Sequence, residues 1–179
     1  GLAKELMFKW RMPAIILSDG LIGQMMEKVV LPDVQPRRTD EEIRQQCPWA
    51  TNGLGLKNRK YNFTSSLELE APLMQDRNRA MTAKYNDISE TEVRYDTYKT
   101  DDADVLLVAY GCSARISMSA VDSLRAQGIK AGLLRPITLW PFPAKEINAL
   151  ADQCKNVFSV EHSEGQMVTD VRLAVGGKA

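Results

Sequence analysis

Apolar and polar positions alternate most regularly in the second half of the chain. The run 104–110 is apolar after its first residue and ends at Gly111, a pattern typical of a strand buried on both faces of a sheet. We expect a helix to follow and to end near Gly128, because glycine readily adopts the conformation that closes a helix. The apolar stripe expected on this helix consists of Ile116, Ala120, Val121 and Leu124.

Two further strand and helix pairs follow at similar spacing. Strands are predicted over 129–134 and 157–161, and Pro143 opens the helix between them. This repeat matches the crossover units that join parallel strands, so we predict an α/β fold with a mainly parallel sheet in three layers. The buried stripes expected on the two helices consist of Ile147, Leu150, Ala151 and Cys154, and of Met167, Val171, Ala174 and Val175.

The beginning of the chain shows a weaker version of the same alternation. A helix is predicted over 2–10, ended by Pro13, and the run 14–17 predicts a buried strand. A second helical pattern then extends to about Val29. One strand and two helices cannot close a sheet between two helical layers. We therefore expect a truncated piece of a second α/β domain, whose other strands are missing from this chain.

The stretch between these two parts is polar and rich in turns. Thr39 and Glu42 have the spacing of a capping box, which predicts a short helix starting there. The other elements expected are a long loop over 47–66, a polar helix over 71–89 and a half-buried edge strand over 93–97.

Composition excludes several classes of function. The 179 residues are 44% hydrophobic and 26% charged, as in a folded domain, and Lys plus Arg equals Asp plus Glu at 23 each. A net charge of zero argues against nucleic-acid binding, which usually requires a basic field. The longest apolar run is far too short to span a bilayer, so no membrane contact is expected.

Three cysteines and one histidine limit the metal and redox chemistry. Cys47, Cys112 and Cys154 are far apart and form no C-x-x-C pair, so neither a disulfide framework nor a zinc site is predicted. Three cysteines also cannot hold an iron–sulfur cluster that needs four. His162 is the only histidine, which excludes a serine–histidine triad elsewhere. This cysteine usage and the lack of a visible signal peptide predict a cytoplasmic protein.

The loops after the strands form the expected working edge of the fold, because parallel sheets bind ligands and partners where strand ends meet helix starts. No catalytic residue is assigned there. Arg115 can bind an anion or pair with a carboxylate, and Gln166 can face a partner or cap the last helix, and the sequence leaves these alternatives open. The candidate interface or ligand residues are Gly111, Ser113, Arg115, Glu161 and Gln166.

Two reactive residue types on the same loops have simpler interpretations. Cys112 follows a buried strand, and no neighbour in sequence would activate its thiol, so packing is favoured over a nucleophilic role. His162 is favoured as a hydrogen-bonding residue of its loop over a catalyst.

A nicotinamide-dinucleotide site is disfavoured at this edge. The fingerprint needs three closely spaced glycines and an acidic residue at the end of the second strand. Gly111 has no second or third glycine, and Arg135 ends the second strand. Gly53 and Gly55 fail as well, because Asn58 occupies the place of the third glycine.

Several strings in the chain are distinctive. They lie at 17–27, 109–111, 114–115, 135–143, 160–161, 165–167 and 170–175. The string Arg-Pro-Ile-Thr-Leu-Trp-Pro-Phe-Pro, followed later by Gly-Gln-Met, is fairly specific. Together these strings resemble the C-terminal part of the alpha subunit of 2-oxoacid:ferredoxin oxidoreductases of the 2-ketoisovalerate type, over nearly the whole chain. The region 93–179 also resembles the transketolase C-terminal domain.

This resemblance implies thiamine diphosphate and magnesium in the complete enzyme. There, oxidative decarboxylation of a branched-chain 2-oxo acid forms an acyl-CoA, and electrons pass through iron–sulfur clusters to ferredoxin. The string Ser18-Asp19-Gly20 lacks the first glycine of the diphosphate-binding motif, and Asn52 lies too far along the chain to complete it. The chain is therefore expected to serve as a scaffold and interface piece, to bind none of these cofactors and to be inactive alone.

The same resemblance predicts three parts. Residues 1–30 correspond to a remnant of a thiamine-pyrimidine-binding domain, 31–92 to a linker with a loop and a helix, and 93–179 to a transketolase C-terminal-like domain. The expected partners are other subunits, ferredoxin through the complex and the 2-oxo acid, with no nucleic acid and no membrane. Two alternatives stay open: a non-catalytic interaction or regulatory module, and a dehydrogenase-like nucleotide binder.

Overall fold

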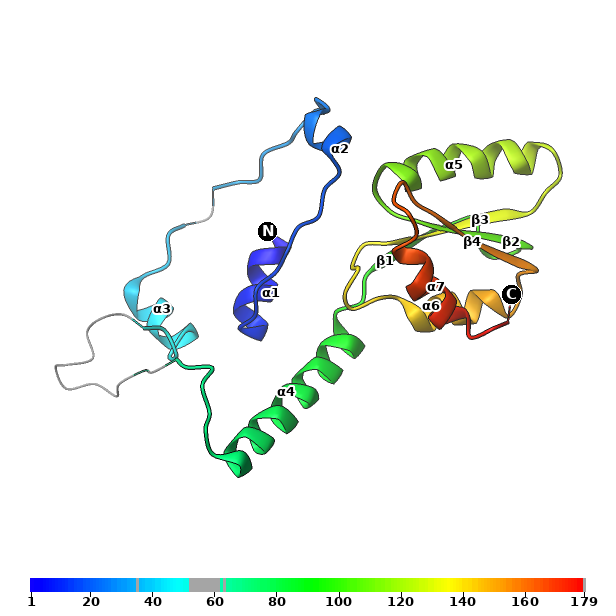
Figure 1. Cartoon of the computed structure of the whole chain (residues 1–179). Coiled ribbons are helices and arrows are strands. Elements are labelled where there is room, and N and C mark those ends of the chain that lie inside the picture. The colour runs from blue at the N-terminus through cyan, green and yellow to red at the C-terminus, as the bar shows by residue number, and fades with distance from the viewer. Residues whose placement is uncertain (35, 52–61, 63, 179) are drawn as a thin grey trace. The chain divides into compact units, whose positions relative to one another are not determined.

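The computed structural model describes residues 1–34, 36–51, 62 and 64–178 (Figure 1). Packing divides the chain into two compact units. The first comprises Gly1–Leu17 and Met26–Arg77, and the second comprises Ser18–Met25 and Asn78–Ala179. The short segment Ser18–Met25 therefore packs with the C-terminal part of the chain, although its neighbours on both sides do not.

A four-stranded sheet forms the centre of the second unit. Its strands β1 (Tyr95–Tyr98), β2 (Val105–Ala109), β3 (Ala131–Pro136) and β4 (Asn156–Val160) are arranged in the order β1-β3-β2-β4. β2 pairs in parallel with both β3 and β4, whereas β1 pairs antiparallel with β3 at one edge. The predicted mainly parallel sheet and the presence of an edge strand are confirmed. The edge strand was predicted over 93–97 as half-buried, and this burial was wrong, because Tyr95, Asp96 and Thr97 of β1 are exposed at the edge of the sheet.

Helices cover both faces of this sheet (Figure 1). α5 (Gly111–Ala126) lies on one face, and α6 (Ala144–Ala151) and α7 (Met167–Val175) lie on the other. The side chains of β2 alternate between the two cores, as the pleat of a strand requires. Leu106 and Val108 join the core under α6 and α7, and Leu107 and Ala109 join the core under α5. Because β2 is buried on both faces, the sheet lies between two helical layers, as predicted.

The buried stripe predicted for α5 was wrong at Ile116, which is 60% exposed. The helix instead buries Ser113, Ala114 and Ser117 beside Val121. Small side chains let a helix backbone approach the sheet closely in a dense core, so the buried face of α5 is selected by size as well as by hydrophobicity. The stripes predicted for α6 and α7 are confirmed: all of their residues are buried except Leu150, which is half-buried.

Three further helices belong wholly or partly to the first unit. They are α1 (Leu2–Trp10), α3 (Asp40–Gln46) and α4 (Ala71–Thr91), the last of which ends in the second unit. The predicted capping box of α3 is present, since the Glu42 carboxylate accepts a hydrogen bond from the Thr39 N–H at 2.7 Å. The Glu42 N–H donates to Thr39 Oγ1 at 3.3 Å in return.

The strand predicted over 14–17 was wrong. The structure has no strand there, and Ile15, Ile16 and Leu17 are 82%, 80% and 69% exposed. A strand needs a neighbour for its N–H and C=O groups, and no strand in the described part of the chain pairs with this run. The following helix, α2 (Gly20–Gln24), is also shorter than the pattern predicted.

Most of the loop predicted over 47–66 lies outside the described residues, and Asn52, Gly53, Gly55 and Asn58 lie outside them too. Near its ends, the side-chain amide of Asn62 donates to the carbonyl oxygens of Pro48 and Ala50, at 2.7 and 3.0 Å. None of the helices in the described ranges has the length and apolar character needed to cross a membrane.

Candidate functional site

The strand β2 leads directly into α5 at the predicted carboxyl edge of the sheet. α5 begins at Gly111, whose φ of +59° lies in the left-handed region. A side chain at this position would also meet Asp19, because a Cβ built on Gly111 lies 3.2 Å from Asp19 Oδ2. Glycine is therefore favoured here by both its backbone conformation and the close approach of a carboxylate.

Glu161, the residue that follows β4, caps α7. Its Oε2 accepts hydrogen bonds from the backbone N–H groups of Gln166 and Met167, and its Oε1 accepts one from Val168, each at 3.0 Å. The hydroxyl of Ser163 donates to Oε2 at 2.6 Å. One side chain thus satisfies N–H groups that the start of a helix leaves without a partner.

These donors determine the charge of Glu161. Partial burial raises the pKa of its carboxyl group, but Ser163 and the three backbone N–H groups lower it more strongly, to about 2. The carboxylate is therefore ionised at neutral pH and lies at the positive end of the α7 dipole. The N–H groups expected to face an anion or partner at this helix start are already bonded to Glu161.

The start of α5 is capped by a residue far away in sequence. Asp19 Oδ2 accepts a hydrogen bond from the Cys112 N–H at 3.2 Å, across 93 positions of the chain. Asp19 Oδ1 accepts a second bond from the Ile22 N–H at 2.7 Å and so caps α2. A single carboxylate therefore caps two helices.

The same carboxylate acts on the thiol of Cys112. The pKa of Asp19 is lowered chiefly by the Ile22 N–H and next by the hydrogen bond to the Cys112 side chain. The bond to Asp19, together with burial, raises the pKa of the Cys112 thiol. The side chain is also only 8% exposed. These features support the packing role predicted for Cys112, because a nucleophilic cysteine needs a lowered pKa.

The first turn of α5 meets the loop after β4 through a serine and the only histidine of the chain. Ser113 Oγ lies 3.1 Å from His162 Nδ1, and Ser113 is buried whereas His162 is exposed. A hydrogen bond of the kind expected for His162 is therefore present. It joins one predicted candidate, Ser113, to the loop that carries another, Glu161.

The remaining candidates, Arg115 and Gln166, are exposed at this edge. Arg115 Nη1 lies 3.9 Å from Met25 Sδ. Gln166 occupies the N-cap position of α7, yet its side chain makes no capping bond because Glu161 takes that place. Asp19 was not among the candidates. An aspartate before Gly20 signals a helix start nearby, but nothing in the sequence points to the second helix that it caps.

The described residues do not fit a magnesium diphosphate site or an iron–sulfur cluster. Within the described ranges, no group of three His, Cys, Asp or Glu side chains could hold a metal ion. Cys47, Cys112 and Cys154 are free thiols. Asp19, the carboxylate of the Ser18-Asp19-Gly20 string, uses both of its oxygens as helix caps. No catalytic step is therefore assigned to these residues.

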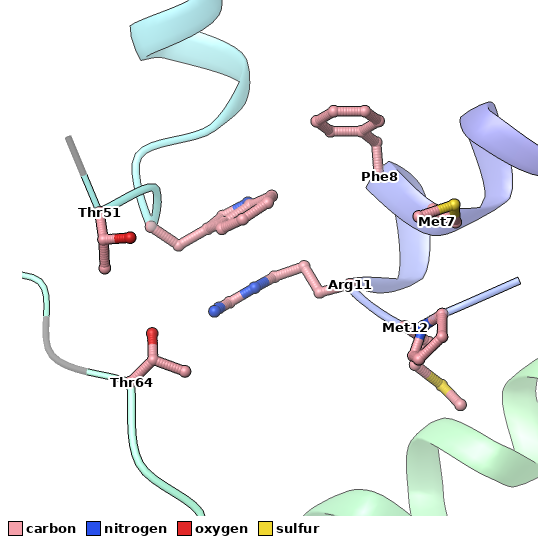
Figure 2. A pocket seen from close by; sticks show the side chains of 8 residues that line it. Met7, Phe8, Arg11, Met12, Thr51 and Thr64 are labelled. Atoms are coloured by element: carbon pink, nitrogen blue, oxygen red, sulfur yellow. The ribbon is translucent and has the colours of Figure 1, made fainter.

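The first unit contains a separate cavity of about 420 Å³ (Figure 2). The guanidinium carbon of Arg11 lies 4.6 Å from the centre of the Trp49 ring. Figure 2 shows this guanidinium pointing toward the gap between Thr51 and Thr64. Among the described residues, the lining contains no acid–base pair. Its other lining residues are Met7, Phe8, Met12 and Pro13.

Comparison with known proteins finds sequences and a solved structure that are similar to this chain. Residues 103–179 match the family model described as pyruvate:ferredoxin oxidoreductase core domain II. The chain is 42% identical to ketoisovalerate oxidoreductase subunit VorB of Methanothermobacter marburgensis, over 97% of this chain and 47% of that protein. It is 28% identical to 2-oxoglutarate synthase subunit KorA of the same organism, over 96% of this chain and 51% of that protein.

A solved structure shares the fold. The 2-oxoglutarate:ferredoxin oxidoreductase from Magnetococcus marinus, with 2-oxoglutarate, coenzyme A and succinyl-CoA bound, matches with a TM-score of 0.56 and 22% identity. The match covers 68% of this chain and 23% of that chain, and at this identity it shows the fold alone. The chain spans about half the length of the curated relatives it matches.

Proposed function

Because the chain is homologous to subunits of 2-oxoacid:ferredoxin oxidoreductases, we propose that it works in the oxidative decarboxylation of a 2-oxo acid coupled to the reduction of ferredoxin. The observation that carries this proposal is the 42% identity to VorB along 97% of the chain. The match of residues 103–179 to a core domain of this enzyme class supports it independently. The resemblance stated from the sequence is thereby confirmed.

The proposed substrate is a branched-chain 2-oxo acid, and the product is the corresponding acyl-CoA. This choice rests on the higher identity to the ketoisovalerate subunit, 42%, than to the 2-oxoglutarate subunit, 28%. Thiamine diphosphate, magnesium, iron–sulfur clusters and coenzyme A belong to the complete enzyme in this proposal. The chain itself serves as a scaffold in the cytoplasm, consistent with its free thiols.

The proposed interface is the carboxyl edge of the sheet. Gly111, Ser113 and Glu161 hold the first turn of α5 and the loop after β4 in place, and Arg115 and Gln166 present exposed side chains to a neighbouring subunit. The partners are the other subunits, with ferredoxin acting through the complex. We retain the division into a remnant of a pyrimidine-binding domain at 1–30, a linker at 31–92 and a transketolase C-terminal-like domain at 93–179.

An activity assay on the complete complex tests the function. The complex is purified with this chain in place, and reduction of a viologen dye is followed with 2-oxo acid and coenzyme A present. We expect the highest kcat/KM with 3-methyl-2-oxobutanoate and lower values with 2-oxoglutarate and pyruvate. A complex that reduces the dye with none of the three acids would overturn the proposal. A preference for 2-oxoglutarate would overturn only the substrate.

Substitutions at the edge test the interface. In the complete complex, Arg115→Ala and Gln166→Ala are expected to weaken assembly or turnover about tenfold, equivalent to roughly 1.4 kcal/mol. The melting temperature of this chain should change little, because both side chains are exposed. Thr169→Ala, on an exposed position of α7, is the matched control. If both variants assemble and turn over like the parent, the carboxyl edge is not an interface.

A further inference from the structure

The segment Ser18–Met25 packs with the second unit although the chain on either side packs with the first. Contacts near each end of the segment lie on the beginning of α5. At one end Asp19 Oδ2 accepts from the Cys112 N–H at 3.2 Å, and at the other Met25 Sδ lies 3.9 Å from Arg115 Nη1. The segment is therefore fastened near both ends to one turn of one helix.

Apolar packing contributes only part of this attachment. Leu21, Ile22 and Met25 are 64%, 36% and 46% exposed, so the segment keeps part of its apolar surface in water. Hydrophobic stabilisation is proportional to the area removed from water. The hydrogen bonds of Asp19 add to this partial burial.

The Asp19 carboxylate also links the attachment to the local fold of the segment. α2 has five residues, too few for a helix to be stable by itself in water. Its start is capped by Asp19 Oδ1 through the Ile22 N–H, while Oδ2 bonds to Cys112. Loss of this one carboxylate removes a cap from α2 and from α5 at once, so α2 should unfold as the segment leaves.

The beginning of α5 is shaped to receive the carboxylate. Gly111 has a φ of +59°, and a Cβ on it would lie 3.2 Å from Asp19 Oδ2. The thiol of Cys112 bonds to the same carboxylate, and the residue is 8% exposed. Arrival of Asp19 therefore covers this thiol, and departure uncovers it.

We infer that residues 18–25 form a strap that the Asp19 carboxylate latches onto the first turn of α5, and that opening of the strap as one unit exposes Cys112. This device needs no partner subunit, since it involves residues of this chain alone, although Gly111 and Arg115 also belong to the proposed interface. It makes the thiol of Cys112 a native reporter of whether the strap is closed.

The test compares alkylation rates of individual cysteines by iodoacetamide in the 179-residue chain, resolved by mass spectrometry. In Gly111→Ala, which keeps the Asp19 carboxylate that raises the Cys112 pKa, Cys112 is expected to react at least about tenfold faster than in the parent, as for a site released from local protection. Asp19→Ala should accelerate the reaction further, because it also removes the carboxylate that raises the thiol pKa. Cys154 serves as the internal control, because it is 7% exposed and its thiol bonds to the Ala103 carbonyl oxygen at 3.2 Å. Asp33→Ala, an exposed aspartate outside the strap, is the matched control variant.

A second measurement distinguishes two roles of Asp19. Either it holds the strap closed as one unit, or it caps α2 and α5 without coupling them. Amide hydrogen exchange at Ile22 and at Cys112 should accelerate together in Asp19→Ala, and Gly111→Ala should accelerate both as well. A Cys112 alkylation rate that stays within twofold of the parent would overturn the inference. Equal acceleration at Cys154 would also overturn it, since the opening would then involve the whole unit. Faster exchange at Ile22 without faster exchange at Cys112 would show that the strap does not open as one unit.

Discussion

Two apolar runs of the chain have similar patterns and opposite environments. The run 14–17 is Ala-Ile-Ile-Leu, and β2 is Val-Leu-Leu-Val-Ala. Ile15 and Ile16 are at least 80% exposed, whereas Leu106 and Val108 are 0% exposed. β2 has a parallel neighbour on each side, and no described strand pairs with the first run. An apolar run thus gives only a tendency to form a strand, and the available neighbours decide whether it forms.

The largest expected effect is on the free energy of unfolding, when one residue in each apolar run is replaced by alanine and the two losses are compared. Leu107→Ala should lower the free energy of unfolding by about 2–5 kcal/mol, because it removes a buried side chain and leaves a cavity. Ile16→Ala should change it by less than about 0.5 kcal/mol, as expected for an exposed site. Denaturant unfolding of the two variants measures both values. A loss below about 1 kcal/mol for Leu107→Ala would place β2 at the surface.

A smaller effect on the free energy of unfolding is expected from removing the cap of α7, which follows strand β4 of the same sheet. Glu161→Ala should lower the free energy of unfolding by about 1–2 kcal/mol, because three backbone N–H groups lose their acceptor. Glu164→Ala removes an exposed carboxylate of the same loop and serves as the control. Equal thermal shifts for the two variants would show that the hydrogen bonds of Glu161 do not stabilise this unit.

The same cap predicts a pH dependence. The pKa of Glu161 falls from an ordinary value of 4.5 to about 2 in the folded chain. A lowered folded pKa adds stability that is fully present above the ordinary value and is lost as pH falls toward the folded value. The difference in melting temperature between the parent and Glu161→Gln should therefore be constant above pH 5 and shrink between about pH 4.5 and 2. A difference that stays constant down to pH 2.5 would contradict this assignment.

Limited proteolysis should sharpen the comparison without any change in sequence. Trypsin is expected to cut first between residues 30 and 70, where Arg37, Arg38 and Arg44 are exposed outside the sheet. The site beside β3 at Lys130 should resist longer because its backbone adjoins the paired sheet. Preferential cutting between 128 and 140 would contradict this prediction, because it would show that the sheet is less stable than the region 30–70.

Sequence patterns predicted the elements that depend on near neighbours. The strands β2, β3 and β4 follow each other through crossover helices, so each has its partner nearby in the chain. The capping box of Thr39 and Glu42 spans three positions and was predicted for the same reason. The buried face of α5 was misjudged at Ile116, because its packing depends on how closely the helix approaches the sheet.

The contacts of the candidate site also differ in how far apart their residues lie in the sequence. Glu161 and the N–H groups it bonds are five to seven positions apart, so this cap could be read from spacing. The bond between Ser113 and His162 depends on strand order, since Ala109 lies beside Val160 only when β2 and β4 are neighbours. The bond from Cys112 to Asp19 crosses 93 positions, and no local pattern encodes such a pairing.

The hydrogen bond between Ser113 and His162 has a spectroscopic consequence. Because His162 is the only histidine among 179 residues, its ring protons give a single set of imidazole resonances, without isotopic labelling or assignment by mutagenesis. The ring lies where the first turn of α5 meets the loop after β4, so its chemical shift and linewidth respond to any molecule that docks there. A titration with a candidate subunit that is itself deuterated, followed by one-dimensional NMR, would therefore report binding at this edge from one isolated signal.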